Sequence, residues 1–169
     1  MMKKFISIML VVLMLALVGV GLMGCDGGES VGGRDNVGLN DRVVLRDVAI
    51  TAETIVIVEP ASEFGRPSEG NKFVGVRFRI ENTSNSTRNV SSLMEFETFV
   101  SGTSLSWSIA ADMANPGESL NGAILAGYSM VGYLMFEVSE GTESVRIRYN
   151  PDLLRERDLT WFVLDVPSS

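Results

Sequence analysis

The 169-residue sequence has no histidine, one cysteine and three lysines, and these shortages exclude much chemistry. Histidine is the usual general base and the commonest metal ligand, so both roles lose their first candidate. A single cysteine cannot form a disulfide within the chain, and the fold must depend on its hydrophobic core. Neither Gly-x-Ser-x-Gly nor Ser-x-x-Lys occurs, so the usual serine nucleophile motifs are missing. We therefore expect no catalytic residues and a protein that is not an enzyme.

Two weaker chemical alternatives rest on carboxylates and thioethers. Glu95 and Glu97 alternate along one predicted strand and could share acid–base chemistry, although a solvated strand face explains them more simply. Thioethers bind Cu(I), which makes four methionines a candidate copper set: Met94, Met113, Met130 and Met135. Core packing is the simpler explanation for Met94 and Met135. Without a thiolate set or an EF-hand spacing, we expect neither a metal nor a bound cofactor.

The N-terminal segment joins Lys3 and Lys4 to an apolar run, Phe5 to Met23, that ends just before the only cysteine. A basic start, an apolar stretch and small residues at a cut site are typical of a secretory signal. Four residues resemble the lipobox of bacterial lipoproteins: Leu22, Met23, Gly24 and Cys25. The resemblance implies that signal peptidase II cleaves before Cys25 and that its thiol carries a diacylglycerol. The protein would then be lipid-anchored at a bacterial cell membrane, facing outside the cytoplasm.

A retained membrane helix or ordinary cleavage stays open as an alternative. About 20 apolar residues cross a bilayer, and the run from Phe5 to Met23 is long enough. The lipobox is favoured because it explains why the sole cysteine follows the apolar run. We therefore expect a signal peptide over residues 1–24, a lipidated cysteine and Gly-rich tether over 25–41, and a β-domain over 42–169. A Gly-rich coil such as Asp26–Asn40 has an end-to-end distance of about 20 Å, enough to clear the head groups.

Acidic residues outnumber basic ones by 21 to 14, which gives a net charge of −7. Removal of Lys3 and Lys4 with the signal peptide leaves 12 basic and 21 acidic residues, and a net charge of −9. Nucleic acids and anionic lipid head groups require a basic surface. We therefore expect no nucleic acid partner, and a membrane association that depends on the lipid anchor.

Beyond Arg42 the hydrophobic pattern has a period of two, which predicts strands with one wet face. Alternation or strand-like composition marks the following segments: Val43–Ile50, Thr54–Val58, Val74–Ile80, Met94–Thr98, Leu105–Ile109, Val131–Val138, Val145–Tyr149 and Leu159–Val166. Pro/Gly/Ser loops and Asn-rich tracts separate them, as turns require. Asp152–Asp158 is the only helix-like stretch. The pattern predicts an all-β antiparallel sandwich, with Gly70 at a sharp turn and Gly132 at a bulge or a close backbone approach.

Two segments carry a family resemblance. Gly70–Phe73 opens a long strand that Asn82 closes, and Gly132–Val138 reads Gly-x-x-x-Phe-Glu-Val. These features resemble a bacterial family of unknown function found on lipoproteins and related to the immunoprotective extracellular antigen of mycobacteria. The resemblance covers about residues 42–166 and implies an immunoglobulin-like sandwich without an agreed activity. Ala126 departs from the pattern, because the family often has proline there.

Arginines on the wet strand faces are the remaining candidates for a site. Arg77 and Arg79 share one face, as do Arg146 and Arg148, and together they could form a stripe that binds an anionic wall polymer or a protein. Pairing with carboxylates such as Glu95 and Glu97 across neighbouring strands is the simpler interpretation.

The sequence favours a non-enzymatic module that binds a protein or a cell-envelope component. A structural or stress-response lipoprotein without a dedicated ligand stays open, as does a carrier of a small ligand or metal. A pocket with convergent polar groups would favour the carrier, and an exposed apolar patch would favour the binding module.

Overall fold

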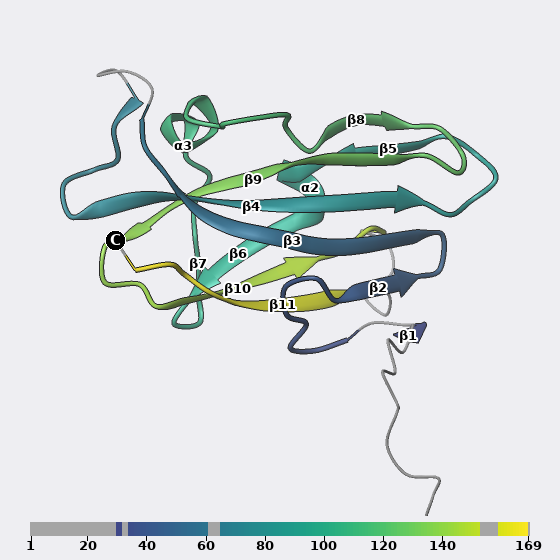
Figure 1. The fold of residues 1–169 in the computed structure, drawn as a ribbon, viewed down its shortest axis with the longest axis horizontal. Helices are drawn as coiled ribbons and strands as arrows, with labels where there is room; N and C mark the ends of the chain where they lie inside the picture. Colours follow the sequence, from purple (N-terminus) through teal and green to yellow (C-terminus); the bar gives the residue numbers. More distant parts are fainter. Residues whose placement is uncertain (1–29, 32–33, 61–64, 153–158, 169) are drawn as a thin grey trace, which may run out of the picture.

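Two β-sheets lie face to face in the computed structural model, which describes residues 30–31, 34–60, 65–152 and 159–168 (Figure 1). The first sheet has the order β1-β2-β3-β4-β9, formed by Ser30–Val31, Arg42–Leu45, Val48–Val58, Asn71–Asn82 and Ser129–Ser139. The second has the order β11-β10-β6-β7, formed by Thr160–Asp165, Ser144–Tyr149, Phe96–Val100 and Thr103–Ser104. A separate ribbon pairs β5 (Arg88–Ser91) with β8 (Asn121–Ile124). The helices α2 (Ser92–Glu95) and α3 (Ile109–Met113) are each about one turn long.

The core forms where the inward faces of the two sheets meet. Phe78 of β4 contacts both Phe96 and Phe162, with ring centroids 5.1 and 5.2 Å apart. Phe96 in turn lies 4.7 Å from Tyr149. Aromatic pairs at these distances add to the free energy of burial, so these rings join three strands of the second sheet to the centre of the first. The all-β, immunoglobulin-like sandwich expected from the sequence is confirmed.

Several predicted strands are confirmed, and three differ from the pattern: one is divided by a turn, one begins within a helix and one is not formed. The run Val43–Ile50 is divided between β2 and β3, because Arg46 adopts a φ of 49° and Asp47 completes a tight turn. Met94 does not lie in a strand as expected: it belongs to α2 and is exposed. The strand expected over Leu105–Ile109 is also wrong, since only Leu105 continues the pairing with β6 before the chain turns away. The helix expected over Asp152–Asp158 lies largely outside the described residues.

The predicted tether is shorter than expected, because residues 34–40 pack against the sandwich. Val37 is buried and bridges to Phe162 of β11, and its backbone amide donates to the Trp161 carbonyl at 2.9 Å. The amide of Asn40 donates to Ala52 of β3 at 2.7 Å. These residues therefore close the edge between β3 and β11, where the sequence had placed a free linker before residue 42.

The roles expected for Gly70, at a sharp turn, and for Gly132, at a close backbone approach, are confirmed. Gly70 has a φ of 77° directly before β4. A Cβ at Gly132 would lie 2.7 Å from the Glu118 carbonyl oxygen, because residues 118–119 run alongside β9 there. That contact is closer than any side chain permits, so the glycine allows the two segments to pair.

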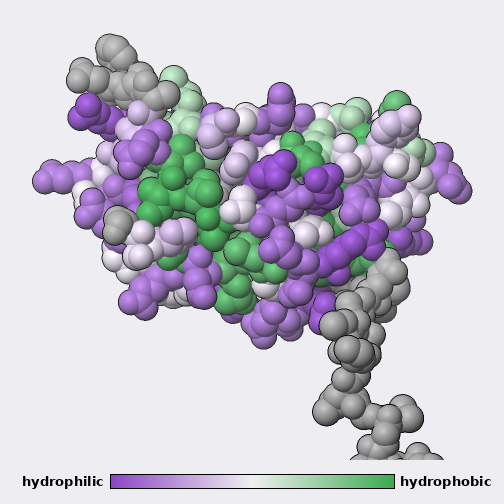
Figure 2. Space-filling view, viewed as in Figure 1, coloured by the Kyte–Doolittle hydropathy of each residue, from purple (hydrophilic) through white to green (hydrophobic). Residues whose placement is uncertain are grey.

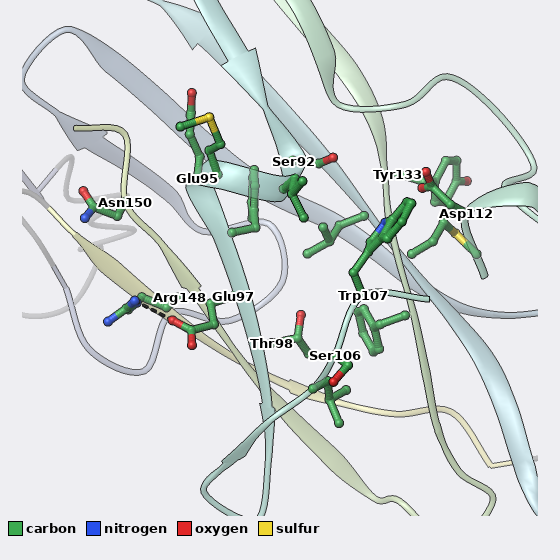
Figure 3. A pocket seen from close by; sticks show the side chains of 17 residues that line it. Ser92, Glu95, Glu97, Thr98, Ser106, Trp107, Asp112, Tyr133, Arg148 and Asn150 are labelled. Atoms are coloured by element: carbon green, nitrogen blue, oxygen red, sulfur yellow. Dashed lines mark hydrogen bonds and ion pairs between the residues drawn. The ribbon is translucent and has the colours of Figure 1, made fainter. Parts of the chain in front are cut away.

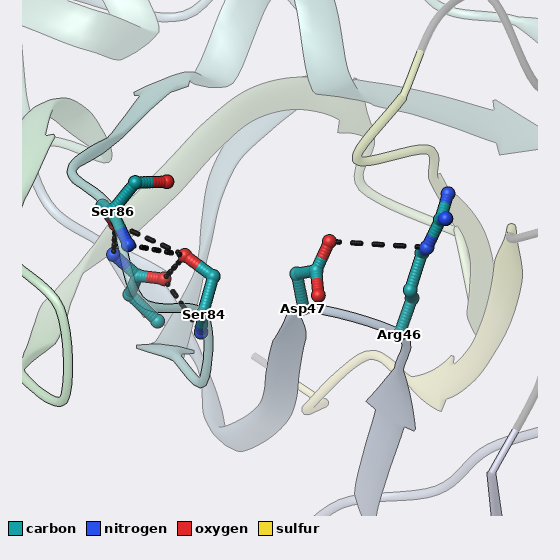
Figure 4. Close-up of polar contacts among 5 residues, drawn as sticks. Arg46, Asp47, Ser84 and Ser86 are labelled. Carbon is teal, nitrogen blue, oxygen red and sulfur yellow. Dashed lines mark hydrogen bonds and ion pairs between the residues drawn. The ribbon is translucent and has the colours of Figure 1, made fainter.

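The Asn-rich tract after β4 is a hydrogen-bonded turn (Figure 4). The buried Asn82 donates through Nδ2 to the carbonyls of Ser86 and Ile124, and its Oδ1 accepts from Ser84. The Thr83 amide donates to Asp47 of the neighbouring β2–β3 turn at 3.0 Å. Asparagine side chains that replace backbone partners in this way are typical of turns.

Candidate functional site

The side of the sandwich between β9 and β6 is incompletely covered. Residues 105–120 cross this gap, and a cavity of about 330 Å³ remains beneath them. Its walls come from α2, β6, β9 and the crossing segment, with Arg148 and Asn150 at one end. Figure 3 shows the Trp107 ring between Ser92 on one side and Tyr133 and Asp112 on the other. We call this cavity and its rim the groove.

The groove exists because β7 has only two residues. The Leu105 amide makes the last bond to β6, to the Thr98 carbonyl at 2.8 Å, and the chain then leaves the sheet. Ser108 caps α3 by accepting from the Ala111 amide at 3.2 Å. Ala111 and Ala114 pack on the outer face of the first sheet against Phe73, Val58 and Met135. The helix therefore holds Trp107 above the groove without filling it.

A second apolar region thus lies outside the main core. Figure 2 shows hydrophobic surface (green) over the left part of the face drawn, where β3 and β4 cross in Figure 1. The exposed large apolar side chains that line the groove are Leu93, Met94 and Trp107, and the adjoining helix α3 exposes Ile109 and Met113. We call these five the groove cluster. Trp107 remains 57% exposed, which is unusual for the largest apolar side chain.

Polar groups in the groove are few and unevenly charged. The Arg148 guanidinium donates to Glu97 at one end. Asp112 at the other end is exposed and has no ion-pair partner among the described residues. The remaining polar lining is neutral, apart from the buried carboxylate of Glu95. The groove therefore carries a net negative charge.

A buried polar cluster supports the inner wall. Arg88 donates to Glu95 at 3.0 Å and to the Pro151 carbonyl at 2.8 Å, which links β5, α2 and the end of β10. Burial raises the pKa of Glu95 despite the neighbouring guanidinium of Arg88. Burial likewise raises the pKa of the Tyr149 hydroxyl, which lies beside Glu95 and Arg88. A carboxyl already held by Arg88 is a structural group, and the acid–base pair considered for Glu95 and Glu97 is not brought together, because each pairs with a different arginine.

Arg77 and Arg79 are held by a single carboxylate. A register shift between Ala52 and Thr54 leaves Glu53 as the extra residue of a β-bulge. Bulges redirect a side chain, and here Glu53 accepts from both arginines at 2.6 Å. Their carboxylate partner is therefore Glu53 and not Glu95 or Glu97, the pairs considered from the sequence.

Arg146 and Arg148 lie on the other sheet, so the four arginines do not form one continuous stripe. Arg148 pairs with Glu97 directly opposite on β6, as cross-strand pairing predicted. Arg146 lies over the Trp161 ring, 4.7 Å from its centroid. No carboxylate lies within ion-pair distance of Arg146 among the described residues. A binding role for either pair stays a prediction.

The methionines considered as copper ligands differ in burial. Met94 and Met113 are exposed on α2 and α3, whereas Met135 is buried beneath α3. Core packing is therefore correct for Met135 and wrong for Met94. Within the described residues, no three histidine, cysteine, aspartate or glutamate side chains are grouped so that they could hold a metal ion.

Sequence reasoning missed the groove cluster. The hydrophobic pattern predicts strand positions for Met94, Trp107 and Ile109, and strand alternation would have buried Trp107 and Ile109. Ser108 followed by Ile109-Ala110-Ala111-Asp112 is a short helix start with a serine cap, and this was the signal available. It was weak because a single helical turn has little periodicity.

Comparison with known proteins shows the family. The profile of a domain of unknown function (DUF4352) matches residues 37–159, and the chain belongs to this family. A candidate lipoprotein (ycdA) of Bacillus subtilis aligns with a TM-score of 0.57 and 21% identity, covering 70% of this chain. The alignment spans only 36% of the ycdA protein. The yjhA protein of B. subtilis aligns with a TM-score of 0.54 and 14% identity, over 77% of this chain and 98% of its own. A conserved hypothetical protein of Bacillus anthracis aligns with a TM-score of 0.51 and 11% identity, over 65% and 87%.

These structural likenesses establish the fold alone, since all lie below 25% identity. A search of curated proteins finds no significant match. The relation to the mycobacterial antigen stays a prediction. The lipobox and Cys25 lie outside the described residues, and within these residues no helix is long and apolar enough to cross a membrane.

Proposed function

We propose that this protein is a non-enzymatic binding module, lipid-anchored at Cys25 on the outer side of a bacterial membrane. Its groove receives an apolar side chain of an envelope protein. The anchor is supported by the lipobox and by the lipoprotein setting described for the B. subtilis structure. The lipid on Cys25 is the only covalent group, and no cofactor takes part.

The groove cluster is the observation that carries this proposal. Three exposed large apolar side chains, Leu93, Met94 and Trp107, line one cavity, and two more lie on the adjoining helix α3, in a chain whose strands bury such residues efficiently. An exposed apolar patch rimmed by polar groups marks an interaction site. Tryptophan and methionine are also enriched where proteins bind each other.

Charge further restricts the partner. Asp112 lacks an ion-pair partner among the described residues, and the mature chain has a net charge of −9. A contact surface that combines an apolar anchor with a lysine or arginine complements this groove. An acidic partner would be repelled, which makes a basic segment of an envelope protein the favoured occupant.

Site-specific crosslinking tests the proposal. A photoreactive phenylalanine at Leu93, in the groove, is compared with one at Leu125, which is similarly exposed at 60% against 67% for Leu93. We expect irradiation of intact cells to give a discrete protein adduct from position 93 and none from position 125. Introducing Trp107→Ser should reduce the adduct by tenfold or more, about 1.4 kcal/mol of binding free energy.

Two outcomes would refute this function. Identical adducts at positions 93 and 125 would show that the groove is not selective. An adduct that persists unchanged in the Trp107→Ser variant would show that the apolar anchor does not contribute. The variant Asp112→Asn provides a milder test, since it should weaken the binding of a basic partner while leaving the fold intact.

A further inference from the structure

The end of the sandwich farthest from the loop before β4 carries a second exposed apolar pair. Leu125 and Tyr128 are the outer residues of a tight turn, in which the Tyr128 amide donates to the Leu125 carbonyl at 3.1 Å. Gly127 supplies the φ of 77° that this turn needs at its third position. The side chains of Leu125 and Tyr128 are 60% and 67% exposed, and neither lines the groove.

Three turns are joined at this end. The amides of Asn82 and Gly127 exchange bonds with the carbonyls of Tyr128 and Asn82, at 2.9 and 3.0 Å. The Thr83–Asp47 bond then connects the β2–β3 turn to them. Leu125 and Tyr128 therefore project from a hydrogen-bonded platform, which we call the turn end.

The N-terminal chain enters near the turn end. Ser30 of β1 lies opposite Val43 of β2, only three residues before the turn at Arg46 (Figure 1). On β3, Ile50 lies opposite Val43, and eight further residues lead to Val58 at the other end. At about 3.3 Å per residue, the chain enters about 10 Å from the turn end and about 26 Å from the opposite end.

The covalent distance to the lipid is short. Four residues separate Cys25 from Ser30, and five residue steps span at most about 18 Å. This replaces the 15-residue tether expected from the sequence. A lipid on Cys25 therefore brings the turn end within reach of the bilayer interface, where tyrosine and leucine side chains are favoured.

We propose that the turn end rests on the membrane surface, with Leu125 and Tyr128 inserted at the lipid interface. This inference rests on the anchor in the proposed function and is independent of the groove. The lipid supplies the affinity, and the two side chains fix the orientation, because a tethered contact benefits from a high effective concentration. The groove cluster is then directed away from the lipid, toward envelope partners.

The sole cysteine makes the test direct. Because Cys25 is acylated, a cysteine introduced at Ala126 or Gly141 is the only free thiol and accepts one environment-sensitive fluorophore. A Cβ at Gly141 meets no atom within 4 Å, and Gly141 follows Glu140, whose amide bonds to Gly70 at the opposite end. In the lipidated full chain on phosphatidylcholine vesicles, the probe at position 126 should shift to shorter wavelength and be quenched by doxyl lipids. The probe at position 141 should behave as in water.

Control variants and lipids distinguish the apolar contact of the turn end from the lipid anchor. Leu125→Ser combined with Tyr128→Ser should remove the shift at position 126 while lipidation persists by mass spectrometry. Phosphatidylglycerol in the vesicles should weaken the shift, because the domain is acidic; a stronger shift would indicate electrostatic adsorption and overturn the apolar contact. A water-like probe at position 126 on a lipidated protein would overturn this inference alone. An unmodified Cys25 would overturn the anchor and the inference together.

Discussion

The two long edges of the sandwich are closed in different ways. At the edge between β3 and β11, residues 34–40 bridge the sheets with backbone bonds on both sides, and Val37 is 2% exposed. At the edge between β9 and β6, residues 105–120 bond to β6 through Leu105 and to β9 through Ser108 and Glu118, and they leave a cavity with Trp107 above it. We refer to them as the closed edge and the open edge.

This difference separates an edge that stabilises the fold from an edge that is available for binding. A short segment with one buried valine completes the core at the closed edge. At the open edge, a longer segment packs two alanines and leaves its larger apolar side chains outside. A cavity bordered by exposed aromatic and aliphatic groups is typical of binding and contributes little to folding. Substitutions at the two edges should therefore separate unfolding from binding.

The largest expected effect follows Val37→Asp at the closed edge. The substitution places an unpaired charge against Phe162, and we expect the free energy of unfolding to fall by about 4 kcal/mol or more. Urea denaturation followed by circular dichroism measures it. Val37→Ala should cost less, since it removes only two methyl groups. A Val37→Asp protein as stable as the wild type would show that the segment is not part of the core.

Gly132→Ala should have an intermediate effect at the open edge. Its Cβ would meet the backbone of residues 118–119 at 2.7–2.9 Å, so the crossing segment must separate from β9. We expect a loss of about 1–3 kcal/mol in the free energy of unfolding. Gly141→Ala is the matched control, because a Cβ there meets nothing and the change should be within about 0.5 kcal/mol. Equal urea midpoints for the two variants would contradict the close approach.

The pH dependence of stability tests the buried wall of the groove. Since burial raises the pKa of Glu95, the folded state binds a proton more readily than the unfolded state. The stability contributed by this proton is present below the ordinary pKa of a glutamate and is lost as pH rises through the raised value. Glu95→Gln removes this loss, so its stability relative to wild type should improve from pH 4 to pH 7.

Glu137 provides a control of opposite sign. Although its partial burial acts to raise the pKa, hydrogen bonds from Asn71, Ser68 and Ser108 hold it below the ordinary value. Its stabilising contribution is present at neutral pH and is lost as pH falls, and because the side chain is only partly buried the effect should be small. Urea midpoints of both glutamine variants at pH 4, 5.5 and 7 should therefore diverge from wild type in opposite directions. If both variants diverged from wild type in the same direction, the opposite pKa shifts of Glu95 and Glu137 would be refuted.

The smallest effect on folding is expected from Trp107→Ser. The side chain is largely exposed at the open edge, so the free energy of unfolding should change by about 0.5 kcal/mol or less, although the crosslink at position 93 should be lost. A large loss of stability would show that Trp107 contributes to core packing, and the two edges would then not differ in the way described.

The sequence predicted local features well. The alternation of Val74–Ile80 and Val145–Tyr149 identified strands with one wet face, and both are central in their sheets. Gly70 and Gly132 were identified because the conformational freedom of glycine and its lack of a Cβ are local properties. The single turn at Arg46–Asp47 was missed because it interrupts a run whose composition is strand-like throughout.

The candidate site was harder to predict from the sequence, since it depends on contacts between distant segments. Whether Val37 is buried depends on β11, more than 120 residues later, and a Gly-rich composition alone predicted a free tether. Arg77 and Arg79 pair with Glu53 because a β-bulge redirects its side chain, and no alternation pattern reveals such a bulge. The exposure of Trp107 depends on β7 ending after two residues.

Residue types and short spacings by themselves predicted the all-β class, which is confirmed, and they are also the basis for the predicted lipobox and for the expectation that catalytic motifs are missing. These follow from residue types and short spacings, which do not require knowledge of distant contacts. Only the tertiary structure decided which edge is closed, where the groove lies and how near the turn end is to Ser30. Those properties arise from the packing of two sheets and of the segments that cross between them, and a linear pattern carries no record of which segments meet.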